Sequence, residues 1–248
     1  MTNIEWTEQT WNPIGGCKVV SPGCTNCYAM RDAYRLSMNP LTPKYQGLST
    51  MVNGKPVWTG KVRLFKHKLE QPAGWRKPRM IFVNSMSDLF YEEIPDKWID
   101  RIFAVMELND RHTYQILTKR PERMRDYVRK RYGGKPAPWP IWLGTSVEDA
   151  KRKSRISILR QVPARVRFIS FEPLLGDLGE LYLKSIHWAI VGGEAGHYRR
   201  KMDLAWVPPI LKQCREQRVA FFMKQVDKKR KIPQSLIIRE YPERRLSA

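Results

Sequence analysis

The chain has 248 residues, of which 45 are Lys or Arg and 24 are Asp or Glu, so its formal net charge is +21. A hydrophobic fraction of 42% and an aromatic fraction of 11% exclude a chain that is disordered as a whole. No apolar run is long enough to span a membrane, and residues 1–6 lack the features of a signal peptide, so we expect a cytoplasmic protein. The positive charge indicates a polyanionic partner, most simply nucleic acid, although a merely solubilising basic surface would give the same count.

The first predicted element is a loop that holds three of the four cysteines, with the spacing Cys17-x6-Cys24-x2-Cys27. In a reducing compartment such a cluster holds metal more often than it forms disulfides. Three thiolates match a cubane [4Fe-4S] cluster in which one iron stays open for a substrate or cofactor. The alternative is a structural zinc ion, which needs a fourth ligand from one of four scattered histidines.

Residues 39–78 follow, with Pro or Gly at nine positions. We expect a long irregular insertion with room for one hairpin. A loop of this length inside a compact domain usually acts as a lid or a binding element. Its second half is strongly basic, because residues 61–79 contain seven Lys or Arg against one acid.

Six short apolar segments come next, and each stops at polar or glycine residues before a helix-like stretch. They cover residues 79–83, 114–117, 141–144, 166–169, 187–191 and 219–223. The segments are rich in β-branched and aromatic residues and show no alternation of polar and apolar positions. This pattern is typical of strands that are buried on both faces of a parallel sheet.

The stretches between these segments have helical features. Asp96 is placed to cap a helix, and Pro121 suits a first helical position. Pro208 and Pro209 fit only the first turn of a further helix. Cys214 falls on the apolar face of that last helix, so we expect a buried core thiol and not a metal or redox site.

The alternation of strands and helices predicts an α/β domain built from βαβ units, either an open doubly wound sheet or a full or partial barrel. In either fold, reactive groups gather at the carboxyl ends of the strands. The polar residues that end the six segments would all lie there. Residues 1–248 are expected to form one domain, with the insertion at 39–78 and a basic extension at 226–248 that contains Lys228 to Lys231 and Arg244 to Arg245.

Two sets of motifs resemble known families. The pairs Asn12-Pro13, Gly16-Cys17, Gly23-Cys24 and Cys27-Tyr28 resemble the radical S-adenosylmethionine (radical SAM) superfamily, closest to its spore photoproduct lyase-like branch. A phage-encoded three-cysteine-motif family of unassigned function is similar over nearly the full length. The blocks that carry this second likeness are Trp11-Asn12-Pro13, Asn84-Ser85-Met86-Ser87-Asp88-Leu89-Phe90, Leu117-Thr118-Lys119-Arg120-Pro121, Phe171-Glu172-Pro173-Leu174-Leu175 and Val191-Gly192-Gly193-Glu194.

The radical SAM resemblance implies a partial TIM-like (β/α) barrel of about six to seven parallel strands, with the cysteines in a loop after the first strand. It implies a [4Fe-4S] cluster on Cys17, Cys24 and Cys27, and S-adenosylmethionine beside it. The predicted cofactor-binding residues are Tyr28, Ser87, Asp88, Lys119, Ser146, Glu172 and Glu194. The chain departs from the branch at Met86, where the lyases have a hydrogen-donating cysteine, and in the wider Cys-x6-Cys spacing.

The function that follows from the resemblance is cleavage of S-adenosylmethionine to a 5'-deoxyadenosyl radical, acting on DNA or RNA in modification or repair. A partner protein that completes the site is compatible with this function. The alternative is a non-catalytic nucleic-acid-binding protein with structural zinc at the three cysteines. A second basic block, with seven Lys or Arg and no acid, covers residues 151–167. Interleaved aromatics either stack on bases or, as we expect for most of them, pack in the core: Trp58, Phe65, Trp75, Tyr127, Tyr132 and Trp139.

Overall fold

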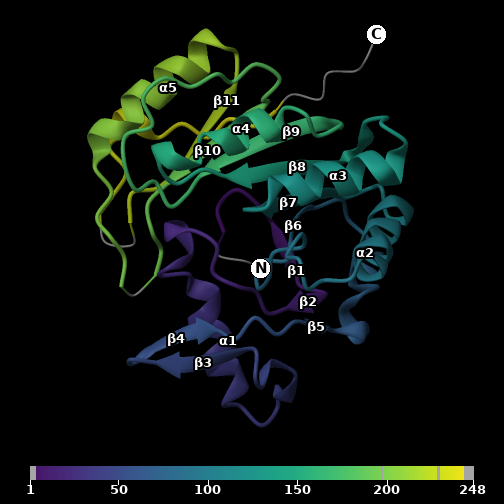
Figure 1. The fold of residues 1–248 in the computed structure, drawn as a ribbon. Coiled ribbons are helices and arrows are strands. Elements are labelled where there is room, and N and C mark those ends of the chain that lie inside the picture. Colours follow the sequence, from purple (N-terminus) through teal and green to yellow (C-terminus); the bar gives the residue numbers. More distant parts are fainter. Residues whose placement is uncertain (1–3, 197, 228–229, 243–248) are drawn as a thin grey trace.

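The computed structural model describes residues 4–196, 198–227 and 230–242, and its centre is one sheet of seven parallel strands (Figure 1). In sheet order the strands are β1 (Gln9–Trp11), β6 (Met80–Val83), β7 (Thr113–Thr118), β8 (Ala137–Ser146), β9 (Ala164–Phe171), β10 (Trp188–Gly192) and β11 (Ala220–Gln225). Neighbours in the sheet follow one another along the chain, and every pair is parallel.

This strand order decides between the two folds that the sequence left open. A doubly wound sheet reverses its strand order part-way, whereas a barrel adds each new strand on the same side. The sheet here adds strands on one side only and curls into a half-barrel that ends at β1 and β11 (Figure 1). The predicted α/β class and partial TIM-like barrel are therefore confirmed.

Four helices cover the outer side of the half-barrel: α2 (Asp96–Leu108), α3 (Pro121–Tyr132), α4 (Ser154–Leu159) and α5 (Val207–Glu216). The first three of these helices, α2, α3 and α4, contact β8, and α5 contacts β11. Within the residues that the structure describes, no helix combines the length and the apolar character needed to cross a membrane.

Most of the local predictions hold, but the described residues 172–187, between β9 and β10, contain no helix, although a helix-like stretch was predicted there. All six apolar segments form strands. Helix α3 begins at Pro121, and Pro208 and Pro209 lie in the first turn of α5, on which Cys214 is fully buried. Asp96 is not a cap: it is the first residue of α2, and its carboxylate instead accepts a hydrogen bond from Arg123 at 2.8 Å. The seventh strand, β1, has only three residues, which is too short to produce a periodic signal.

The core has two parts on the two faces of the sheet. The larger part lies between the sheet and the outer helices. The smaller part fills the inside of the half-barrel with mostly aromatic side chains, namely Trp6, Phe82, Trp142, Val166, Phe168, Trp188, Ile190 and Phe222. The aromatic residues for which the sequence left two roles also pack: Trp58, Phe65 and Tyr127 are buried, and the others contact these cores.

The insertion forms a separate small layer together with α1 (Tyr28–Ser37), which contacts both strands of the hairpin β3 (Ser49–Val52) and β4 (Lys55–Trp58). Asn53 and Gly54 turn the hairpin, and both have positive φ angles, as a tight Asn-Gly turn requires. A second short pair joins β2 (Ile14–Gly15) to β5 (Arg63–Leu64). Cys17 and Cys27 pack against the core of this layer, so the insertion supports the cysteine loop from one side.

The described part of the C-terminal extension lies along β11. The backbone amide of Met223 donates to Ile238, and the amide of Glu240 donates to Phe221. The chain therefore covers the outer edge of β11 in an antiparallel direction, as the bridge between Phe222 and Arg239 also shows. The basic residues 228–229 and 244–245 of this extension lie outside the described residues.

Candidate functional site

A cavity with about 180 Å³ of open space lies where the strands of the half-barrel end and the cysteine loop approaches them. Every site residue predicted from the sequence lines it: Cys17, Cys24, Cys27, Tyr28, Ser87, Asp88, Lys119, Ser146, Glu172 and Glu194. These ten residues come from the cysteine loop, α1 and the carboxyl ends of β6 to β10. The fold thus brings side chains from positions 17 to 194 to one place.

The cysteine loop is short and internally bonded. A 3-10 turn at Pro22–Cys24 is followed by a bond from the Cys27 amide to the Cys24 carbonyl at 3.2 Å, and α1 begins at the next residue. None of the three thiols is in a disulfide, and all are partly exposed. The buried Cys214 is far from this loop, on the outer helix α5.

The electrostatics of the thiols show what a ligand would have to supply. Burial, and to a smaller extent the Asp88 carboxylate, raises the pKa of Cys17 to about 12, although Arg120 acts to lower it. Burial also raises the pKa of Cys27, although two backbone amides in the first turn of α1 lower it. Thiolate charges on neighbouring cysteines oppose one another. A bound cation or metal cluster would offset this repulsion, so the donor set fits a thiolate-ligated group.

The described residues do not contain three His, Cys, Asp or Glu side chains close enough to enclose a single metal ion. A cubane cluster binds each thiolate through a different iron, so its ligands surround a volume instead of meeting at one point. Among the histidines, His67 lies in the insertion, and His112 and His187 directly precede β7 and β10 at the amino ends of the strands. His197 is outside the described residues. The cluster stays a prediction.

Asp88 is held by the end of β7 and is only 7% exposed. Its carboxylate accepts hydrogen bonds from the Thr118 hydroxyl at 2.6 Å, the Lys119 amide at 3.0 Å and the Arg120 guanidinium at 2.9 Å. Ser87 donates from its hydroxyl to the Gly16 carbonyl at 2.7 Å. Both side chains therefore use their polar atoms within the protein, and they position the cysteine loop against the strand ends.

Lys119 and Glu172, which follow later strands, also line the cavity and are half-buried, whereas Asp88 is buried. Lys119 donates from Nζ to the Ser146 hydroxyl at 3.2 Å, which leaves its other hydrogens for a ligand. Glu172 forms an ion pair with Lys224 on β11. The cavity thus presents both cationic and anionic groups, which suits a ligand that carries both an ammonium and a carboxylate.

Glu194 follows β10 and bonds back to the cysteine loop. Its carboxylate accepts from the Asn26 side-chain amide at 3.0 Å and from the Arg200 backbone amide at 2.6 Å. Burial alone would raise the pKa of Glu194, but the hydrogen bonds from Arg200 and Asn26 lower it, so the group is ionised. Its role in this structure is to join the loop after β10 to the loop that carries the cysteines.

Three further residues that sequence reasoning missed hold the cysteine loop. Arg120 donates to the Lys18 carbonyl at 3.2 Å, and Arg200 donates to the Pro22 carbonyl at 2.8 Å. Glu148 accepts from the Gly23 amide at 3.4 Å and pairs with Arg155. Their signal in the sequence was weak, because a charged residue after a strand looks like the start of a solvated helix.

Three buried polar atoms at the cavity have no hydrogen-bond partner among the described residues. They are the indole nitrogen of Trp6, before β1, the side-chain amide nitrogen of Asn84, at the end of β6, and the hydroxyl of Ser170, on β9. Asn84 is 3% exposed and Ser170 is fully buried. A buried donor without a partner costs stability, and such groups in natural proteins generally meet water or a ligand. The cavity is therefore built to receive a polar group.

A family model matches residues 1–241. The chain belongs to the family described as protein of unknown function (DUF5131). No curated protein and no solved structure matches it. The DUF5131 match includes the cysteine loop, all seven strands of the half-barrel and every residue that lines the cavity.

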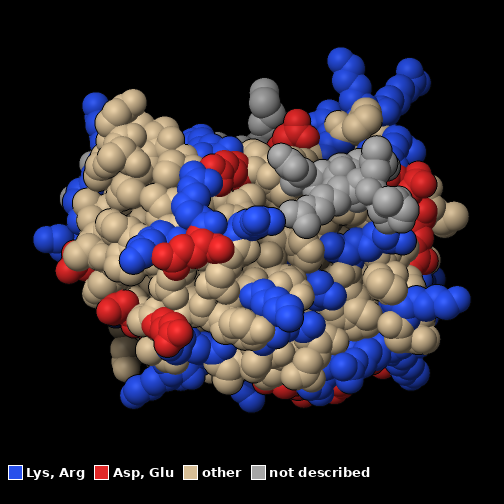
Figure 2. All heavy atoms as spheres, turned by 90° about the horizontal axis from the view of Figure 1, so that it is seen from above, with Lys and Arg blue, Asp and Glu red and all other residues tan. Residues whose placement is uncertain are grey.

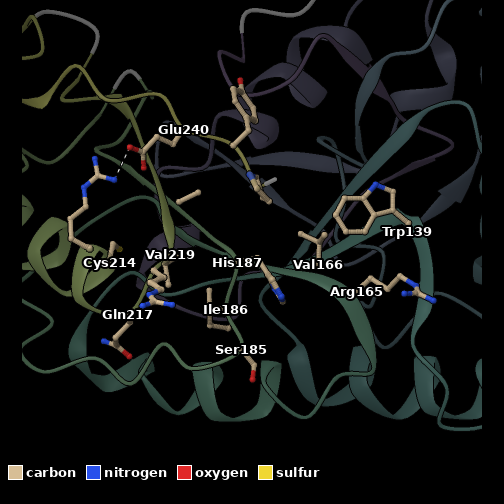
Figure 3. Close-up of a pocket in the computed structure, with 15 residues that line it drawn as sticks. Trp139, Arg165, Val166, Ser185, Ile186, His187, Cys214, Gln217, Val219 and Glu240 are labelled. Atoms are coloured by element: carbon tan, nitrogen blue, oxygen red, sulfur yellow. Dashed lines mark ion pairs between the residues drawn. The ribbon is translucent and has the colours of Figure 1, made fainter. Parts of the chain in front are cut away.

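The DUF5131 chain has a second and wider cleft of about 780 Å³ at the opposite end of the sheet. Figure 3 shows Val166 and His187 on its floor, Trp139 and Arg165 on one side, and Glu240 on the other. None of the ten predicted residues lines it. In parallel barrels the reactive groups lie at the carboxyl ends of the strands, so the smaller cavity at the cysteines is the candidate site.

The basic surface of this DUF5131 chain is distributed, not concentrated. On the face seen in Figure 2, Lys and Arg side chains are scattered with Asp and Glu between them. Within residues 151–167, Arg155 pairs with the buried Glu148, and Arg167 donates to the Val162 carbonyl at 2.8 Å. The net charge therefore indicates a polyanionic partner but does not by itself show where on the surface that partner binds.

Proposed function

We propose that this protein is an iron–sulfur enzyme of the radical SAM type that acts on nucleic acid. In the proposed reaction, one electron from a low-potential donor would break a carbon–sulfur bond of S-adenosylmethionine, and the products would be methionine and a 5'-deoxyadenosyl radical able to remove a hydrogen atom from the substrate. A cytoplasmic location goes with the proposal, because thiols there stay reduced.

One observation carries the proposal. All ten residues that the sequence predicts for the site line a single cavity at the carboxyl ends of a parallel half-barrel. Among the described residues, the same cavity also has unpartnered buried polar atoms on Trp6, Asn84 and Ser170, which are not among the ten predicted site residues. Convergence of thiols, both signs of charge and free polar atoms supports a site for a polar cofactor beside a thiolate-bound cluster.

The chain's own residues have distinct tasks in this proposal. Cys17, Cys24 and Cys27 would bind three irons, and the chemistry that the bound cluster supplies is electron transfer. Lys119 and Glu172 offer opposite charges to the amino acid part of the cofactor. The aromatic floor of the half-barrel excludes water beneath the cavity, which protects a reactive radical from side reactions.

The test is iron and acid-labile sulfide content after anaerobic purification, together with formation of 5'-deoxyadenosine from S-adenosylmethionine. We expect about four irons per chain. Replacing any one of Cys17, Cys24 or Cys27 by Ala should remove both iron and product. Cys214→Ala is the matched control and should keep both, because that thiol is buried on α5. Equal losses in all four variants would show that the ligands are misassigned.

A further inference from the structure

The cysteine cavity opens into a groove of about 500 Å³ that runs over α1 and the insertion hairpin. Cavity and groove share lining residues, among them Asn26, Cys27, Tyr28 and Ser85. The groove is bounded by α1, by β4 and by the segment after β10. The cavity alone is smaller than the roughly 300–1,000 Å³ usual for ligand sites, so a substrate at the cysteines would extend into the groove.

The groove is electropositive. Its lining contains the cations Arg31, Arg35, Lys55 and Lys224 against a single acid, Asp32. Arg31, Arg35 and Lys55 are exposed. The contact between Arg35 and Asp32 is long, 3.9 Å, and both side chains are solvated, so it holds Arg35 only weakly. Lys224 is paired with Glu172. Three exposed cations thus line the groove outside the cavity.

Two exposed tyrosines lie in the same groove. Tyr28, next to Cys27, is 39% exposed, and Tyr198 is 51% exposed. The Lys55 ammonium lies 4.9 Å from the centre of the Tyr198 ring, so the hairpin touches the segment after β10 at this point. Large exposed aromatic rings beside cations are typical of surfaces on which the bases of a single strand stack while the cations hold phosphates.

We propose that this groove binds a single-stranded stretch of nucleic acid and delivers one unstacked base past Tyr28 to the cysteine cavity. The proposal rests on the proposed function in taking the cavity as the place of reaction. Arg31, Arg35 and Lys55 hold the phosphates, and Tyr198 stacks on a base. A base inside a duplex cannot enter a cavity below the protein surface, so the strand is single or the base is extruded.

The first test uses fluorescence anisotropy with the full-length protein as purified anaerobically and a labelled single-stranded DNA, an RNA of the same sequence and the corresponding duplex. The variant Arg31→Gln/Arg35→Gln removes two phosphate contacts. It should weaken single-strand binding by about tenfold and lower the slope of log K against log salt by about 1.4. The control Lys97→Gln/Lys130→Gln makes the same charge change at exposed positions of α2 and α3, and should bind like the parent protein.

The second test concerns stacking. Tyr198→Ala should weaken single-strand binding by about fivefold or more. Tyr182→Ala is the matched control, because Tyr182 is also exposed and also lies under a cation, with Arg160 at 4.1 Å, but outside the groove. Tyr182→Ala should leave binding unchanged.

The outcomes separate this proposal from the proposed function. Groove variants that bind single strands like the parent, or control variants that lose as much, overturn the groove assignment even if the protein cleaves S-adenosylmethionine. Duplex that binds as tightly as the single strand overturns the single-strand part. Loss of binding in the groove variants alone supports the groove even if no iron is found. Tighter binding of the DNA or of the RNA strand supports it and identifies the natural backbone.

Discussion

Arg120 joins three parts of the candidate site, and its replacement tests how the fold holds the cysteine loop. Its guanidinium is 6% exposed and donates to the Asp88 carboxylate at 2.9 Å and to the Lys18 carbonyl at 3.2 Å. It also lies 4.7 Å from the centre of the Tyr91 ring. Arg120→Met keeps most of the volume of the side chain but removes its charge and its donors.

The expected loss of unfolding free energy follows from the buried Asp88 carboxylate, which Arg120→Met leaves without its cationic partner. Breaking a buried ion pair by removing one partner costs about 3–5 kcal/mol, because the other charge stays buried without compensation. Asp88 keeps the hydrogen bonds from Thr118 and from the Phe90 amide, so we expect a loss near the lower limit, about 3 kcal/mol. For a domain of this size, that corresponds to a decrease in Tm of about 6–12 °C.

The assay is thermal unfolding followed by circular dichroism, with Arg125→Met as the matched control. Arg125 is on α3, and its partner Asp126 is 64% exposed, so its loss should leave the Tm unchanged within error. The double variant Arg120→Met/Asp88→Asn removes both charges and should unfold at a higher temperature than Arg120→Met alone. A Tm for Arg120→Met equal to that of the control would refute the role of Arg120 in holding the network together.

Two further predictions concern the backbone and the pH dependence. Gly193→Ala should destabilise the protein strongly, because a Cβ there would lie 2.0 Å from the Val226 carbonyl, whereas Gly74→Ala, with open space around it, should be neutral in the same urea titration. Burial alone would raise the pKa of Glu107, but hydrogen bonds from Arg131 and Tyr132 lower it. A carboxylate whose pKa is lower in the folded state than in the unfolded state stabilises the folded state at pH values above the ordinary pKa of Glu. The loss of unfolding free energy in Glu107→Gln should therefore shrink as the pH falls below about 4, and a loss independent of pH would contradict the assignment.

The sequence was sufficient for the central parts of the fold. Buried parallel strands have a strong signal, because short runs such as 187–191 contain β-branched and aromatic residues without polar alternation. Proline at residues 121 and 208 located the first turns of two helices through its fixed φ and its missing amide hydrogen. Asp96 failed as a cap because Pro95 occupies that position and a nearby arginine competes for the carboxylate.

The sequence was sufficient to predict which residues belong to the candidate site, but not what each of them does there. Residues at the ends of parallel strands must meet at one edge, so Ser87, Lys119 and Glu194 could be placed together without coordinates. Which of them face open space depends on contacts between distant segments. The Asp88 carboxylate accepts a hydrogen bond from Thr118 at the end of β7, and the Glu194 carboxylate accepts one from Asn26. A buried group without a partner, such as the Ser170 hydroxyl, can be recognised only from the packing around it.

X-ray absorption at the iron and zinc edges of the anaerobically purified protein tests most directly whether three thiolates hold an iron–sulfur cluster at the carboxyl end of the half-barrel. We predict an iron edge with sulfur and iron neighbours, and a change in the spectrum when S-adenosylmethionine is added. A zinc edge with four ligands and sulfur at about 2.3 Å, with no bound iron, would contradict the proposed cluster.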